Sequence, residues 1–90
     1  MSLGEDQSPL QFPTDYPIKV VGRTADDFRP RIDSLVLIHT PDLTPERISE
    51  RASGAGNFTS ITYNIIARDR DHVTNLVNAL ASADGVLMVI

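Results

Sequence analysis

The sequence contains no cysteine, which excludes disulfide bonds, thiolate zinc sites and cysteine nucleophiles. It also has no apolar run that approaches the roughly 20 residues a membrane-spanning helix needs, so we expect no membrane partner. The N-terminus is acidic and lacks the basic and apolar regions of a signal peptide. These absences predict a cytoplasmic location.

Cationic side chains are scarce as well: 8 Lys and Arg stand against 12 Asp and Glu, and Lys19 is the only lysine. This balance argues against general nucleic-acid binding. The 90 residues are enough for one domain. Residues 1–11 are polar and acidic, without an apolar period. We therefore expect a disordered tail over residues 1–11, followed by a single domain over residues 12–90.

Hydrophobic periodicity predicts the element order β-α-β-β-α-β. The predicted strands and helices are, in chain order, strand 16–23, helix 28–39, strand 46–52, strand 58–67, a helix capped by Asp69 and ended by Gly85, and strand 86–90. Right-handed crossovers then give a ferredoxin-like α+β sandwich: a four-stranded antiparallel sheet in the order 4-1-3-2, with two helices on one face. That fold hosts many unrelated functions, so the side chains rather than the fold indicate function.

The sheet face that the helices leave open carries the most informative side chains. Alternation along the first three strands directs the side chains of residues 19, 21 and 23, of residues 47, 49 and 51, and of residues 58, 60, 62 and 64 toward it. From this set we select as candidate ligand-binding residues Lys19, Arg23, Arg47, Arg51, Ser60, Thr62 and Asn64. In one interpretation this face is solvated or self-associating, and the charged ends of its lysine and arginine side chains remain in water. The other is an anion-binding surface, in which hydroxyls donate hydrogen bonds beside the cations.

Two further segments bear on ligands and partners. The loop residues Gly54, Gly56 and Asn57 either form a backbone nest for an anion or simply turn a hairpin. The closing strand, residues 86–90, is apolar on both faces, which favours a homodimer or another protein partner.

Catalytic and metal chemistry find little support in the sequence. We expect a structural role for His39 and a surface position for His72. We expect no metal site, cofactor or catalytic residue. Residues 22–29 superficially resemble the phosphate loop of acylphosphatases, yet Asp26 and Asp27 would repel a phosphate there. RNA recognition on stacked aromatics is disfavoured because Phe58 and Tyr63 have opposite parity on their strand.

Several short motifs together resemble a known family. They are Phe12-Pro13, Tyr16 with residues 18–22, residues 39–42, Ser53 with residues 56–62, and the ending Val-Leu-Met-Val-Ile. In order and spacing they resemble the YbeD-like family of small bacterial proteins of unknown function. The resemblance implies the same fold, a likeness to small-molecule-binding regulatory domains of amino-acid biosynthetic enzymes, and a link to lipoate metabolism. It carries over no catalytic residue, and Ala55 stands where the family commonly has lysine.

Together these observations predict a non-catalytic regulatory module that binds a small anionic ligand. A protein-interaction adaptor that uses the open sheet face is the alternative. An acylphosphatase-type enzyme is a further alternative that rests on Arg23 and the Gly22 turn alone.

Overall fold

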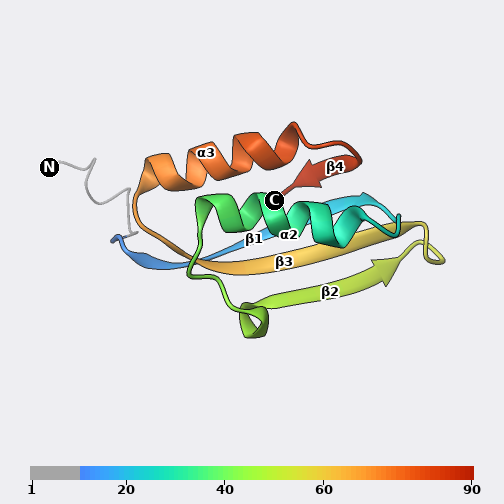
Figure 1. Ribbon diagram of the computed structural model, residues 1–90, viewed down its shortest axis with the longest axis horizontal. Helices are drawn as coiled ribbons and strands as arrows, with labels where there is room; N and C mark the ends of the chain where they lie inside the picture. Colours follow the sequence, from blue (N-terminus) through green and yellow to red (C-terminus); the bar gives the residue numbers. More distant parts are fainter. Residues whose placement is uncertain (1–10) are drawn as a thin grey trace, which may run out of the picture.

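The computed structural model of the chain describes residues 11–90 (Figure 1). The elements follow the order β1 (Thr14–Arg23), α2 (Phe28–His39), the 3-10 helix η1 (Pro45–Arg47), β2 (Ile48–Ser53), β3 (Phe58–Ala67), α3 (Arg70–Ala81) and β4 (Val86–Val89). The predicted disordered tail lies outside the described residues, except for Gln11.

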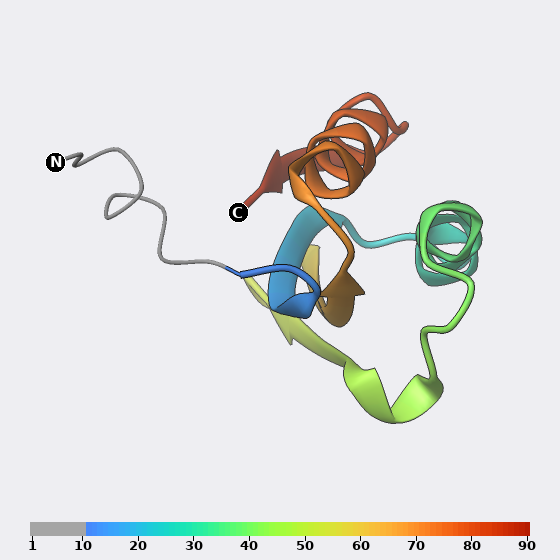
Figure 2. The same ribbon diagram turned by 90° about the vertical axis from the view of Figure 1, so that its left-hand side faces the viewer.

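The four strands form one antiparallel sheet in the order β2-β3-β1-β4. Figure 2 shows α2 and α3 on the same side of this sheet, which leaves the other face open. The arrangement confirms the predicted ferredoxin-like sandwich and its strand order. Alternation along β1 and β3 is therefore a reliable guide to which side chains lie under the helices.

The core lies between the sheet and the two helices. Ile18 and Val20 on β1 and Ile61, Tyr63 and Ile65 on β3 are at most 1% exposed. The helices contribute the buried side chains of Phe28, Ile32, Val36, Leu76 and Leu80. These positions are the apolar stripes that the spacing predicted, so the helices turn their apolar sides to the sheet.

The second strand begins two residues later than the alternation predicts. Pro45 opens the short helix η1, which also contains Glu46 and Arg47. Proline has a fixed φ and no N–H to donate to a sheet, and the N–H of Arg47 bonds to the carbonyl of Thr44 instead. The prediction that Arg47 lies on a strand was therefore wrong.

His72 is also placed differently from the prediction of a surface residue. It is only 7% exposed. Its Nδ1 accepts a hydrogen bond of 3.0 Å from the Arg68 backbone N–H. Its Nε2 therefore carries the proton and donates to the His39 carbonyl oxygen at 2.7 Å. The ring ties the start of α3 to the end of α2, and this long-range contact leaves no local signal in the sequence.

One glycine explains how closely α2 approaches the sheet. A Cβ at Gly22 would lie 2.3 Å from Cζ of Phe28 and 2.6 Å from the carbonyl oxygen of Gly85. Only a residue without a side chain fits between this ring and the turn before β4. Within residues 11–90, no helix has the length and apolar character needed to cross a membrane.

Candidate functional site

Strand register brings the open-face side chains into two rows that run across β1, β3 and β2. In the first row Lys19 lies opposite Thr62, which lies opposite Ser49. In the second row Val21 lies opposite Ser60, which lies opposite Arg51. A cation therefore stands at one end of each row, and hydroxyl side chains occupy the middle strand between them.

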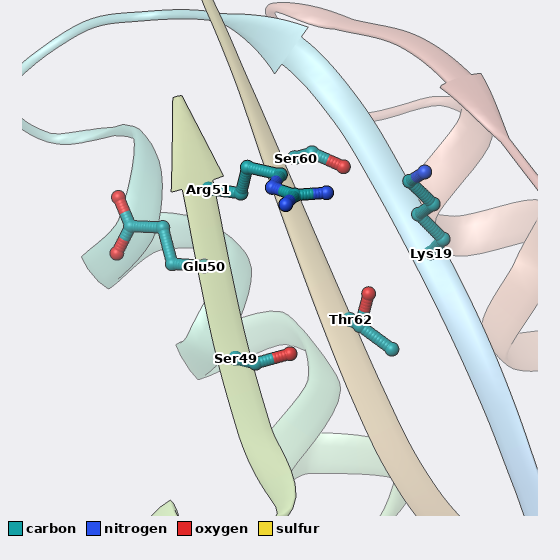
Figure 3. A pocket seen from close by; sticks show the side chains of 6 residues that line it. All are labelled: Lys19, Ser49, Glu50, Arg51, Ser60 and Thr62. Carbon is teal, nitrogen blue, oxygen red and sulfur yellow. The ribbon is translucent and has the colours of Figure 1, made fainter. Parts of the chain in front are cut away.

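A hollow of about 290 Å³ lies over these two rows. Its lining residues are Lys19, Ser49, Glu50, Arg51, Ser60 and Thr62. Figure 3 shows Lys19 on β1 at one side, the Arg51 side chain reaching over β3 from the other, and the hydroxyls of Ser60 and Thr62 between them. The hollow is shallow, since Lys19, Ser49 and Arg51 are exposed and the two β3 hydroxyl residues are half-buried.

The only carboxylate among the lining residues points away from the hollow. In Figure 3 the Glu50 side chain extends to the far side of β2. Its Oε1 there accepts a hydrogen bond of 2.7 Å from Nη1 of Arg29 on α2. The hollow therefore presents two cationic ends and three hydroxyls, although the whole chain has a formal net charge of −4.

A polar network behind the sheet keeps this arrangement. The Arg29 guanidinium that binds Glu50 also donates from Nε to the Asp33 carboxylate, at 2.7 and 2.9 Å to its two oxygens. Asp33 Oδ1 also accepts a hydrogen bond of 2.6 Å from the Tyr63 hydroxyl. Burial raises the pKa of Tyr63, and its hydrogen bond to Asp33 raises that pKa further. The network joins α2 to both β3 and β2, and no local pattern in the sequence indicates it.

Three of the predicted side chains lie outside the hollow. Arg23 lies opposite Phe58 at the far end of β1, and Asn64 lies beyond Thr62 toward the other end of β3. Arg47 projects from η1, where its Nη1 donates to Asp15 Oδ1 at 3.3 Å and to the Asn64 carbonyl oxygen at 3.0 Å. Arg47 is thus already occupied within the chain, whereas Lys19, Arg51, Ser60 and Thr62 all line the hollow.

The loop candidates have the geometry of a hairpin turn. Gly54, Ala55 and Gly56 all have positive φ, at 61°, 58° and 88°. The N–H of Gly56 bonds to the carbonyl of Ser53, and the carbonyl of Asn57 accepts from the N–H of Thr24. None of these loop residues lines the hollow. Their positive φ values serve the turn between β2 and β3.

Two lining residues, Ser49 and Glu50, were not among the predicted site residues, and only Ser49 turns its side chain toward the hollow. Ser49 lies on the open face between the predicted positions 47 and 51, and its register opposite Thr62 places its hydroxyl at the hollow. The period of two along β2 already indicated this position. Within residues 11–90, no group of three or more histidine, aspartate or glutamate side chains is placed to hold a metal ion.

Comparison with known proteins identifies the family. Residues 7–90 match the family described as "Protein of unknown function (DUF493)". The chain belongs to this DUF493 family. A UPF0250 protein from Janthinobacterium sp. (strain Marseille) is 40% identical over 80 residues, which cover 89% of this chain and 88% of the relative. A UPF0250 protein from Hahella chejuensis is 30% identical over the full length of both chains. These matches confirm the resemblance to YbeD-like proteins.

Two solved structures share the fold at low sequence identity. The ACT domain from GTP pyrophosphokinase of Chlorobium tepidum has a TM-score of 0.65 at 22% identity and covers 84% of each chain. The C-terminal domain of the MgtC protein from Mycobacterium tuberculosis has a TM-score of 0.64 at 19% identity, covering 90% of this chain and 88% of its own. Both confirm the ferredoxin-like fold of this DUF493 protein.

Proposed function

We propose that this DUF493 protein is a non-catalytic regulatory module that binds a small anionic ligand on the open face of its sheet. The observation that carries the proposal is the hollow between Lys19 and Arg51, where hydroxyls lie between two cations and Glu50 is turned away. Ammonium and guanidinium groups with adjacent hydroxyl donors match a carboxylate or phosphate group.

The chemistry of the lining residues supports binding rather than catalysis. A serine or threonine hydroxyl becomes a nucleophile when a neighbouring base accepts its proton. The side chains that face the hollow are two cations and three hydroxyls, and none of them is a histidine or a carboxylate. The acylphosphatase alternative is also weakened, because Arg23 lies outside the hollow.

The fold and the family support a regulatory role. The ACT domain of a GTP pyrophosphokinase shares the fold, and the resemblance to YbeD-like proteins implies small-molecule control linked to lipoate metabolism. Lipoate carries a carboxylate, to which Lys19 and Arg51 would donate hydrogen bonds. We therefore include it beside inorganic phosphate as a test ligand, and we retain the prediction that the module acts in the cytoplasm.

Titration with inorganic phosphate and, separately, with lipoate tests this proposal by NMR of the backbone amides. We expect the first and largest shifts at Lys19, Arg51, Ser60 and Thr62. Because the hollow is shallow and wet, we expect dissociation constants in the range of roughly 0.1–10 mM. The double variant Lys19→Met, Arg51→Met should abolish the shifts.

The matched control is Arg23→Met, which removes an exposed cation from the same face outside the hollow. It should leave the dissociation constant within about twofold of the wild-type value, since Arg23 does not line the hollow and an exposed charge that makes no direct contact contributes little. Shifts confined to the helices, or an equal loss in Arg23→Met, would contradict the proposal. In that case the adaptor alternative becomes the better hypothesis, and Lys19→Glu with Arg51→Glu should then abolish capture of the protein partner.

A further inference from the structure

The two edges of the sheet are protected very differently. The edge strand β2 carries Glu50 and Arg51, and a charged edge resists pairing with another strand. The other edge strand, β4, has the sequence Val-Leu-Met-Val and contains no charged, polar or proline residue. An uncharged apolar edge of this kind is a template for pairing with another chain.

The backbone of β4 offers hydrogen-bonding groups on its outer side. Ile90 and Lys19 exchange two backbone hydrogen bonds, of 3.0 and 2.8 Å. In an antiparallel ladder the groups of neighbouring residues point to opposite sides, so the N–H and carbonyl of Val89 point away from β1. They are therefore available to a strand that lies on the outer edge of the sheet.

The side chains around this edge are apolar as well. Leu87, Met88 and Ile90 are 49%, 51% and 67% exposed. An apolar groove of about 220 Å³ runs between β4 and α3 and is lined by Val77, Ala81, Val86, Leu87, Met88 and Val89. A partner strand on β4 would cover these side chains while it paired with the backbone.

We infer that β4 pairs with β4 of a second copy of this chain, antiparallel about a two-fold axis. The charges at the two ends of β4 favour this occupant. Asp84 precedes the strand, and Lys19 lies beside its end through the bonds to Ile90. Antiparallel pairing sets the start of one β4 against the end of the other, so Asp84 of each copy lies at the same end of the interface as Lys19 of the second copy. The edge is thus self-complementary in charge.

The resulting dimer has one continuous eight-stranded sheet, with the helices of both copies on the same side. Its two open faces then form a single surface, and the hollow of each copy opens toward the same side. The inference concerns the edge of the sheet and does not depend on whether the hollow binds an anion.

Native mass in solution and amide hydrogen exchange test the pairing. The full chain should have a native mass of twice 9.9 kDa at high concentration and dissociate on dilution. The Val89 amide should exchange slowly in the dimer and rapidly on dilution. The Lys19 amide, which bonds within the chain, should show protection that does not depend on this dilution.

Leu87→Lys should raise the dimer dissociation constant by about tenfold or more, because a charge on an edge strand opposes pairing. Ile38→Lys is the matched control: it makes the same change at a 75% exposed position on α2, away from β4, and should leave the dimer intact. A native mass of one chain with rapid Val89 exchange at high concentration overturns the inference. The inference is also overturned if the dimer persists in Leu87→Lys but is disrupted by Arg51→Glu on β2. The wild-type exchange measurement decides the matter even if Leu87→Lys fails to fold.

Discussion

The hydroxyl of Tyr63 donates a hydrogen bond of 2.6 Å to Oδ1 of Asp33, a contact that joins the buried side of β3 to the middle of α2. The Tyr63 side chain is fully buried, whereas the side chain of Asp33 is 25% exposed and is also held by Arg29. Arg29 binds Glu50 as well, so the contact belongs to a network that connects α2, β3 and the edge strand β2. It lies directly behind the candidate anion site.

Removing this hydroxyl should destabilise the fold without unfolding it. We expect Tyr63→Phe to lower the free energy of unfolding by about 1–2 kcal/mol, because a hydrogen bond to a charged group is lost while the ring still fills the core. Urea denaturation measures the change. Tyr16→Phe, at a half-buried position, should cost less than about 0.5 kcal/mol. Equal effects of the two variants would show that the Asp33 contact has no special weight.

The same tyrosine makes stability depend on alkaline pH. Burial and the hydrogen bond to Asp33 raise the pKa of Tyr63 above the ordinary tyrosine value of 10.0. The folded state therefore holds a proton that the unfolded state releases above pH 10, so stability is present below that pH and falls as the pH rises through it. The fall should approach about 1.4 kcal/mol per pH unit. Urea denaturation at several alkaline pH values should show a smaller fall in Tyr63→Phe, and equal slopes would contradict this prediction.

The hairpin between β2 and β3 should become more stable when Ala55 is replaced by glycine. Ala55 has a φ of 58°, a conformation in which a Cβ crowds the backbone. We expect Ala55→Gly to raise the melting temperature and the free energy of unfolding by up to about 1 kcal/mol. The neighbouring change Gly54→Ala should do the reverse, because the new Cβ would lie 2.7 Å from Cδ2 of Phe58. A loss of stability in Ala55→Gly would contradict the strain argument.

Anion binding at the hollow should weaken as salt is added. Lys19 and Arg51 are exposed, so their attraction for a ligand is screened over about 10 Å at 0.1 M ionic strength. We expect the dissociation constant for phosphate to rise at least about threefold between 20 and 200 mM sodium chloride. The NMR titration measures this directly. A salt-independent constant would indicate that the two cations do not hold the ligand.

Whether a structural feature could be predicted from the sequence depends on how local its determinants are. The span of α2 from Phe28 to His39 was predicted from its apolar spacing, because this signal lies within the helix itself. The strand Phe58–Ala67 was predicted in the same way from its strict alternation. The start of β2 was missed because Pro45 diverts the chain into η1 before the alternation begins.

The candidate site was predictable only in part. Parity alone placed Lys19, Arg51, Ser60 and Thr62 on the open face, since that property repeats every two residues along a strand. Parity does not say which residues on different strands lie opposite one another. The binding of Arg47 to Asp15 and the burial of His72 against the end of α2 likewise depend on segments far apart in the chain.

The sequence by itself therefore determined the two helices, the four strands apart from the start of β2, the order of the strands and most of the side chains that face away from the helices. Periodicity and turn residues carry this information because they act over a few positions. Only the tertiary structure decided that Lys19, Thr62 and Ser49 share a row and that Glu50 turns toward Arg29. Strand register and helix docking are set by packing of the whole core, and no short stretch of sequence contains that information.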